Sequence, residues 1–68
     1  MELSARNQIK GTVKAVTLGA VMAEVTLDIG NGKEIVSVIT KASAERLGLK
    51  QGVEATAIIK SSEVMLAR

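Results

Sequence analysis

The side chains that could do chemistry in this 68-residue sequence are hydrogen-bond donors rather than nucleophiles or metal ligands. Arg offers a planar fork that grips two oxygens of one anion, Lys offers a compact charge, and hydroxyl groups add donors without adding charge. Such residues stand at or near the ends of the expected elements, at Ser4, Arg6, Thr40, Ser43, Lys60 and Ser61. These residue types indicate an anion site, provided that the fold brings them together.

Each of these donors also has a simpler interpretation. Thr40 or Ser43 would serve as the cap of a helix, and Ser61 would form part of a hairpin turn. Arg6 would belong to a frayed terminus, and Lys60 would be an ordinary surface lysine. The donors lie far apart in the sequence, so spacing alone leaves both interpretations open.

The composition lacks several of the residue types on which enzyme catalysis often depends. The chain has no His and no Cys, so most nucleophile–base pairs are missing. A zinc site made only of carboxylates would be unusual. The carboxylates fall mainly at solvent-side strand positions or turns, and no pair has a spacing that suggests two facing acids. The sequence predicts a binding protein rather than an enzyme, with no metal cation.

Charge and composition also argue against polymeric and membrane partners. The net charge of +2, from nine basic and seven acidic residues, is too even for a general polyanion binder. The chain has no aromatic ring on which bases could stack. Its apolar runs are far shorter than the ~20 residues of a membrane span, and Met1–Arg6 carries no apolar signal region. We expect a cytoplasmic protein with no nucleic-acid and no membrane partner.

Size predicts self-association. Residues 1–68 are expected to form one domain. A chain of this length buries only about 60% of the surface that it exposes when unfolded. Domains this small usually need disulfides, a metal or partner subunits, and the missing Cys and His leave partner subunits as the remaining route. We expect an oligomer.

The elements that must position the donors are mainly β-strands. Residues 21–29 alternate apolar and polar side chains, as in a half-buried strand. Gly30-Asn31-Gly32 predicts a tight hairpin turn, and the β-branched segment 34–40 is expected to return as a more buried strand. Residues 8–16 form an earlier strand, ending in a turn at 17–20, in which Gly11 suggests a bulge or a close backbone approach.

One helix and two more strands follow in the predicted order. Residues 42–47 are the only helical stretch, with Gly48 as its C-cap and N–H groups at its start that suit an anion. After a turn at 51–52, strands are expected over 53–60 and 63–67. This order predicts an all-β fold, a five-stranded OB-like Greek-key barrel with one short helix between strands 3 and 4. A flat meander is the alternative, but closing its edges favours a barrel for so small a domain.

Five short segments, in order along the chain, carry a family resemblance. They are Ser4-Ala5-Arg6-Asn7-Gln8, Gly11-Thr12-Val13, Leu18-Gly19-Ala20-Val21, Ile39-Thr40-Lys41-Ala42-Ser43, and Ala57-Ile58-Ile59-Lys60-Ser61 with Val64-Met65. Together they resemble the molbindin family, the small molybdenum-pterin-binding or Mop proteins, from Ser4 to about Ala67. Similar domains occur as ligand-binding modules in molybdate-responsive regulators and molybdate-transporter ATPases.

The resemblance implies a particular assembly and two kinds of site. It implies a homohexamer, built as a trimer of dimers with exchanged N-terminal strands, which binds molybdate or tungstate between subunits. At the main site, Ser4, the Ala5 backbone and Arg6 of one subunit would face Thr40, Ser43, Lys60 and Ser61 of its partner. A second type of site, near the threefold axis, is expected around Gly19, Ala20, Val21 and Val38.

The function implied by the resemblance is intracellular storage or buffering of molybdate and tungstate. A pocket made only of donors satisfies an unprotonated tetrahedral dianion, whereas phosphate is partly protonated at pH 7 and would lack an acceptor. The alternative is an interaction or regulatory module that delivers molybdate or molybdopterin to a partner protein. A pterin ring usually needs an aromatic or apolar slot, and nothing in this aromatic-free sequence points to one.

Overall fold

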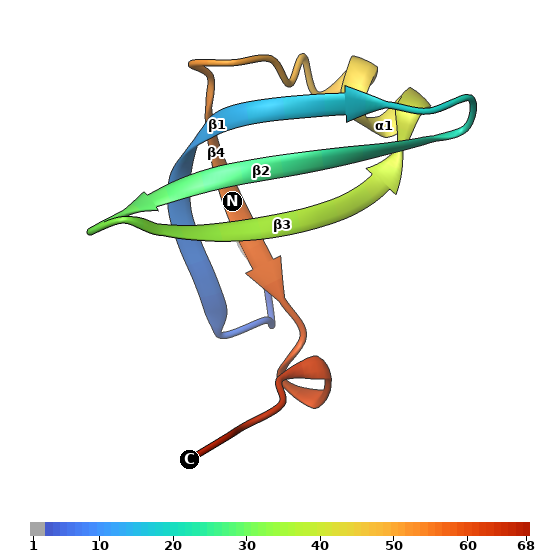
Figure 1. Cartoon of the computed structure of the whole chain (residues 1–68). Helices are drawn as coiled ribbons and strands as arrows, with labels where there is room; N and C mark the ends of the chain where they lie inside the picture. Colours follow the sequence, from blue (N-terminus) through green and yellow to red (C-terminus); the bar gives the residue numbers. More distant parts are fainter. Residues whose placement is uncertain (1–2) are drawn as a thin grey trace.

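The computed structural model describes residues 3–68, so the predictions made for Met1 and Glu2 lie outside the described residues. The elements are β1 (Asn7–Leu18), β2 (Met22–Gly30), β3 (Lys33–Thr40), α1 (Lys41–Arg46), β4 (Glu54–Ile59) and the 3-10 helix η1 (Ser61–Glu63). The strands form one antiparallel sheet in the order β3-β2-β1-β4 (Figure 1). The predicted all-β class and the position of the helix are confirmed.

The fifth strand expected over residues 63–67 is not formed. The prediction of five strands is therefore wrong for the described part of a single chain, residues 3–68, which forms four. Ser61–Glu63 form η1, and residues 64–68 extend away from the sheet (Figure 1). A strand needs an edge to pair with, and no edge of the described chain lies alongside this segment. The residues of this segment favour an extended backbone, but the described chain has no strand beside them with which they could pair.

β1 is long and bent, and it joins the two ends of the sheet. Its first half, Asn7–Thr12, pairs with β4, and its second half, Thr12–Leu18, pairs with β2. A Cβ atom at Gly11 would lie only 2.8 Å from the Asp28 carbonyl oxygen, which confirms the predicted close approach. The bulge lies slightly later, between Val13 and Ala15. The bend curls the sheet, so that β4 crosses behind β2 and β3 (Figure 1).

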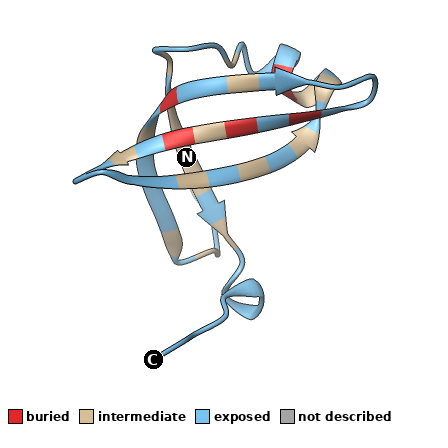
Figure 2. Ribbon diagram, viewed as in Figure 1, coloured by how far each residue is buried: buried red, intermediate tan, exposed pale blue. Residues whose placement is uncertain are grey.

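The core is centred on β2, an inner strand of the sheet. The alternation predicted for this strand is confirmed from Met22 to Leu27, because Ala23, Val25 and Leu27 are buried while Met22 and Glu24 are exposed (Figure 2). It is wrong at Val21, which precedes the strand and is 69% exposed. Val13 of β1 completes the buried cluster with Val25 and Leu27. The predicted hairpin turn after β2 is also confirmed, since Asn31 has a φ of 55° between two glycines that also have positive φ.

β3 is not the more buried strand that its β-branched composition predicted. It is an edge strand whose residues alternate between exposed and half-buried. Val36 and Val38, on its outer face, are 58% and 62% exposed. β-branched residues favour a strand whichever face is covered, so composition alone could not show that the outer face is open.

α1 is short and capped at both ends. Thr40 caps its start, and its Oγ1 accepts a hydrogen bond from the Ser43 N–H. After Arg46 the chain turns through Gly48, whose φ is 64°. The N–H groups of Gly48 and Leu49 donate to the carbonyls of Glu45 and Ala44, which confirms the predicted C-terminal cap. No helix among residues 3–68 has the length and apolar character needed to cross a membrane.

Candidate functional site

The segment before β1 and the end of β4 meet in one pocket. Antiparallel pairing of Asn7 with Ile59 brings these two parts of the chain side by side. The residues that line the pocket, called here the cationic pocket, are Ser4, Ala5, Arg6, Ile58, Lys60 and Ser61. Five of the seven residues predicted for the main site are therefore brought together within a single chain, whereas the resemblance implied that Lys60 and Ser61 belong to a different subunit from Ser4, Ala5 and Arg6.

The cationic pocket carries two positive charges and no carboxylate. In the part of the chain that the structure describes, the ion pairs are Lys10–Glu54 and Lys14–Glu34. Neither pair includes Arg6 or Lys60, and both of these side chains are exposed. Gln8 Nε2 donates a hydrogen bond of 2.8 Å to the Ala5 carbonyl, which ties the N-terminal segment to β1. The two cations are therefore held on one side of the molecule and are available to an anion.

Thr40 and Ser43 lie elsewhere, at the start of α1, and do not line the cationic pocket. Thr40 Oγ1 accepts from the Ser43 N–H at 3.1 Å and donates to Ser43 Oγ at 2.8 Å. The helix-cap interpretation of Thr40 is thus confirmed. One chain alone does not bring Thr40 and Ser43 into the pocket that holds Lys60.

The residues predicted for a second type of site lie near the start of α1. Gly19, Ala20 and Val21 connect β1 to β2, and the Lys41 N–H donates to the Val21 carbonyl at 2.7 Å. A shallow pocket beside this connection is lined by Ala20, Val21, Thr40, Lys41, Ala42 and Glu45. Gly19 and Val38 do not line it; Val38 is paired with Glu24 on the outer face of β3.

Four lining residues were missed by sequence reasoning, namely Ile58 in the cationic pocket and Lys41, Ala42 and Glu45 in the shallow pocket. Ile58 contributes an apolar wall to the cationic pocket, and Lys41 places a cation beside Thr40. Lys41 directly follows Thr40, so adjacency alone could have suggested it. Ile58 alternates with the half-buried Ala57 and Ile59 along β4, and this alternation would have placed it on the pocket side of the strand.

Comparison with known sequences and structures identifies the family. The profile of the TOBE domain matches residues 3–66. Molybdenum-pterin-binding protein 3 of Clostridium pasteurianum is 53% identical over 66 residues, which span 97% of this chain and 97% of that protein. The chain belongs to the molbindin, or Mop, family. Molybdenum-pterin-binding protein MopB of Rhodobacter capsulatus is 52% identical over 96% of this chain but only 24% of its own length, so this domain also forms part of longer proteins.

Solved structures of molbindins share the fold. An apo form of MopII from Clostridium pasteurianum superposes with a TM-score of 0.92 at 48% identity, over 98% of this chain and 100% of that one. A molybdate-binding protein from Sporomusa ovata gives a TM-score of 0.93 at 37% identity, over the full length of both chains. ModG, a cytoplasmic molybdate-binding protein solved with molybdate bound, gives 0.92 at 52% identity, over 96% of this chain and 46% of ModG.

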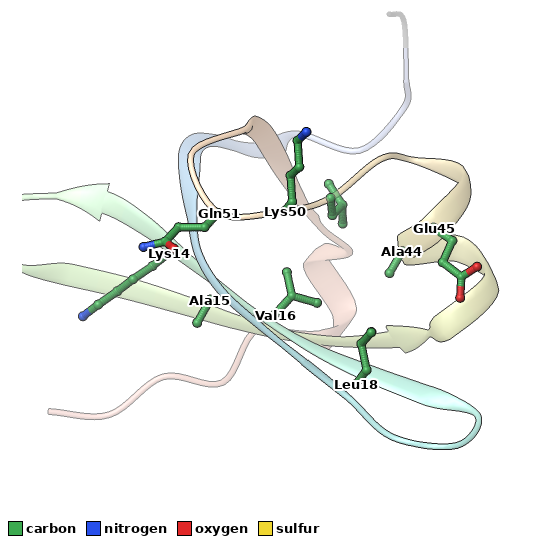
Figure 3. Close-up of a pocket in the computed structure, with 9 residues that line it drawn as sticks. Lys14, Ala15, Val16, Leu18, Ala44, Glu45, Lys50 and Gln51 are labelled. Atoms are coloured by element: carbon green, nitrogen blue, oxygen red, sulfur yellow. The ribbon is translucent and has the colours of Figure 1, made fainter.

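Another pocket of this molbindin, between β1 and the α1–β4 connection, is less suited to an anion (Figure 3). Val16 and Ala44 form its apolar wall, and Lys14, Lys50 and Glu45 stand around it. Lys14 pairs with Glu34, whose hydrogen bond and charge raise the pKa of the Lys14 ammonium. Figure 3 shows Lys14 and Glu45 pointing away on opposite sides. Because Lys14 is already paired and the Glu45 carboxylate lies nearby, this pocket has less positive charge available to bind an anion than the cationic pocket has.

The described residues do not form a cluster of side chains suited to binding a metal cation. Among residues 3–68, no group of three or more His, Cys, Asp or Glu side chains is placed to hold a metal ion. The donors of the cationic pocket are ammonium, guanidinium and hydroxyl groups, which bind oxygen atoms of an anion rather than a metal centre directly.

Proposed function

We propose that this molbindin binds molybdate in the cationic pocket and stores or buffers it in the cytoplasm as a binding protein rather than an enzyme. The observation that carries the proposal is the meeting of Arg6 and Lys60, with the hydroxyls of Ser4 and Ser61, in a pocket without a carboxylate. The charges of Arg6 and Lys60 match those of a dianion. The names of relatives that bind molybdate or a molybdenum-pterin support this choice of ligand.

Donor chemistry explains the preference for this class of oxyanion. Molybdate carries no proton at neutral pH, so a site made only of donors leaves none of its oxygens opposed to another acceptor. Phosphate is partly protonated and would leave its O–H without a partner, which lowers its affinity. Sulfate has the same charge but is smaller, so donors spaced for molybdate reach it poorly. Tungstate is nearly the same size as molybdate, and we propose that the pocket binds both.

Assembly completes the site in this proposal. The cationic pocket lies at the surface, and its Ser4, Arg6, Lys60 and Ser61 are exposed in the single chain. Thr40 and Ser43 of a neighbouring subunit would supply further donors. A homohexamer, arranged as a trimer of dimers with exchanged N-terminal strands, would have a main site at each such interface. A second type of site around residues 19–21 and Val38 remains a prediction.

Equilibrium dialysis against molybdate, followed by molybdenum analysis, tests the proposal. We expect bound molybdenum in a fixed ratio to protein, displaced by tungstate but not by equimolar phosphate or sulfate. Native mass spectrometry of the same samples gives the subunit count and the number of anions together. Protein that stays free of molybdenum after dialysis against excess molybdate contradicts the proposal.

A second candidate function is an interaction or regulatory module that delivers molybdate or molybdopterin to another protein. The observation that favours it is the presence of this domain within longer relatives, including molybdenum transport protein ModE of Azotobacter vinelandii, which is 50% identical over 97% of this chain and 24% of its own length. Pull-down of the intact protein, with analysis of metal and pterin in the captured material, separates the two. Free oxyanion supports storage; pterin held with a partner protein supports delivery.

A further inference from the structure

The cationic pocket contains backbone acceptors as well as donors. Each residue that lines it brings one N–H group, which can donate to an anion, and one carbonyl oxygen, which repels an anion. The charged and hydroxyl side chains therefore do not by themselves make a pocket that prefers an unprotonated oxyanion. The preference also depends on whether the carbonyl oxygens of the lining residues are already engaged by donors of the protein itself.

Two of these carbonyls are engaged by the turn that follows β4. The Glu63 N–H donates to the Lys60 carbonyl at 2.9 Å. The Val64 N–H donates to the Ser61 carbonyl at 3.3 Å. These bonds belong to η1 and its C-terminal cap. The backbone acceptors of Lys60 and Ser61 are therefore occupied, while both residues remain exposed.

The carbonyl of Ala5 is engaged in a different way, by a side chain. Ala5 lies before β1, outside the helices and strands, and Gln8 Nε2 donates to its carbonyl at 2.8 Å. Gln8 does not line the cationic pocket. It pairs with Ile58, which does, and residues directly opposite each other on paired strands share one face of the sheet. Gln8 is thus placed beside the pocket and contacts it through Ala5.

This hydrogen bond also fixes the direction of the next backbone donor. The carbonyl of Ala5 and the N–H of Arg6 belong to one planar peptide group, which is trans, so the two point to opposite sides. Holding the carbonyl toward Gln8 therefore turns the Arg6 N–H away from Gln8. A segment whose peptide plane is fixed before the anion arrives loses less conformational entropy on binding.

We propose that Gln8 is a positioning residue that sets the specificity of the cationic pocket. By holding the Ala5 carbonyl, Gln8 orders residues 4–6 and keeps a backbone acceptor from the anion. Molybdate, which carries no proton at neutral pH, then meets donors, whereas the O–H of hydrogen phosphate finds one acceptor fewer. The inference rests on the proposed function, and Gln8 acts without touching the anion.

Gln8→Met tests the specificity. Methionine has nearly the same length but no donor, and Gln8 is exposed, so the fold should be kept, which far-UV circular dichroism verifies. Loss of one neutral hydrogen bond should weaken molybdate binding by about two- to tenfold. Phosphate should bind at least as well as before, because the freed Ala5 carbonyl can accept a hydrogen bond from its O–H. Calorimetric titration with molybdate and competition by phosphate at pH 7 measure the ratio of the two affinities.

The matched control is Gln51→Met, the same change at the other glutamine of the chain. Gln51 is exposed and does not line the cationic pocket, so both affinities should remain those of the wild type. A ratio of molybdate to phosphate affinity in Gln8→Met equal to that of the wild type overturns the specificity role. A fall in this ratio supports it, since a general loss of structure would weaken the binding of both anions alike.

Double variants test the positioning. If Gln8 acts through the segment that carries Arg6, the effect of Gln8→Met should shrink in the Arg6→Ala background. It should persist at full size in the Lys60→Ala background, because Lys60 follows β4 and lies outside that segment. Equilibrium dialysis at raised molybdate concentrations measures these weaker affinities. An effect of equal size in both backgrounds overturns the positioning role.

A measurement on the ligand-free protein separates this inference from the proposed function. Backbone order parameters from NMR relaxation should fall at Ala5 and Arg6 in Gln8→Met and stay unchanged along β4. Wild-type protein that takes up no molybdenum contradicts the proposed function, and lowered order parameters then still support the ordering of the segment by Gln8. Wild-type protein that binds molybdate, with order parameters and affinities unchanged in Gln8→Met, overturns the inference about Gln8 alone.

Discussion

The two groups of residues predicted to bind the anion differ in the hydrogen bonds and ion pairs that their polar atoms already make within the chain. At the start of α1, Thr40 and Ser43 bond to each other and cap the helix. In the cationic pocket, Arg6 and Lys60 lie outside both ion pairs found among residues 3–68. The hydroxyls of Thr40 and Ser43 therefore have a structural role whether or not an anion is bound. The charges of Arg6 and Lys60, in contrast, are available to an anion. Affinity should depend mainly on the charges, and local stability on the hydroxyls.

The largest effect should come from removing the two charges of the cationic pocket. Losing one hydrogen bond to a charged group costs about 1.5–3 kcal/mol, so Arg6→Ala or Lys60→Ala alone should weaken molybdate binding by about ten- to a hundredfold or more. The double variant should lose measurable binding. Both side chains are exposed, so the melting temperature of the ligand-free protein should change little. Calorimetric titration and thermal melts measure the two quantities.

Ser62→Ala is the matched control for the charge variants. Ser62 is a polar neighbour of the same turn, but it does not line the cationic pocket, so binding should remain close to that of the wild type. If both charge variants bound molybdate as tightly as the wild type, the assignment of the site to this pocket would be wrong.

The next effect tests the strand that connects the two groups. At Gly11 of β1 a Cβ atom would meet the backbone of Asp28 at 2.8 Å and the Ile29 side chain at 3.1 Å. Gly11→Val should therefore lower the free energy of unfolding by about 1–3 kcal/mol through overpacking. Thr12→Val, at the next and exposed position, should change it far less. Urea unfolding followed by far-UV circular dichroism measures both; equal stability of the two variants would show that the close approach at Gly11 is not a constraint.

A smaller effect is expected at the start of α1. Thr40→Ala removes the side-chain acceptor for the Ser43 N–H, and loss of such a cap costs about 1 kcal/mol of stability. Because a neutral hydrogen bond contributes only about 0.5–1.5 kcal/mol, molybdate binding should weaken by about tenfold or less. Thr40→Ser keeps the hydroxyl and should restore both quantities. A loss of binding as large as that of Lys60→Ala would contradict the contrast between charges and hydroxyls.

Local signals in the sequence predicted the fold where neighbouring residues determine it. The alternation along β2 predicted which side chains are buried, and Gly48 predicted the end of α1 because the left-handed backbone there favours glycine. The errors arise where the outcome depends on what lies opposite. The extended backbone of residues 64–68 has no edge to pair with inside the described chain, and β3 is an edge strand whose outer face is exposed. Neither fact is encoded in the local pattern.

The candidate site was not predictable from spacing. Arg6 and Lys60 are more than fifty residues apart in the sequence, and they share a pocket only because β1 and β4 pair in a register that sets Asn7 opposite Ile59. That register follows from the whole sheet, so composition could name suitable donors without assembling them. The resemblance to molbindins supplied the grouping. The single chain brings Lys60 together with Ser4, Ala5 and Arg6, and keeps Thr40 apart.

The smallest effect should come from a lysine whose charge is already used. Lys14 pairs with Glu34, and this contact raises the pKa of Lys14 above its ordinary value of 10.5. A pKa raised in the folded state gives a stabilisation that is fully present below pH 10.5 and is lost as the pH rises through the folded-state pKa. Lys14→Met should therefore lower the melting temperature slightly at pH 7 and remove that part of the decline above pH 10.5. The pair is exposed, so salt should shrink the difference.

Molybdate affinity of Lys14→Met at pH 7 should equal that of the wild type, since the paired ammonium offers an anion little and does not line the cationic pocket. A loss of affinity comparable to that of Lys60→Ala would mean that the overall positive charge, rather than the two available cations of one pocket, attracts the anion.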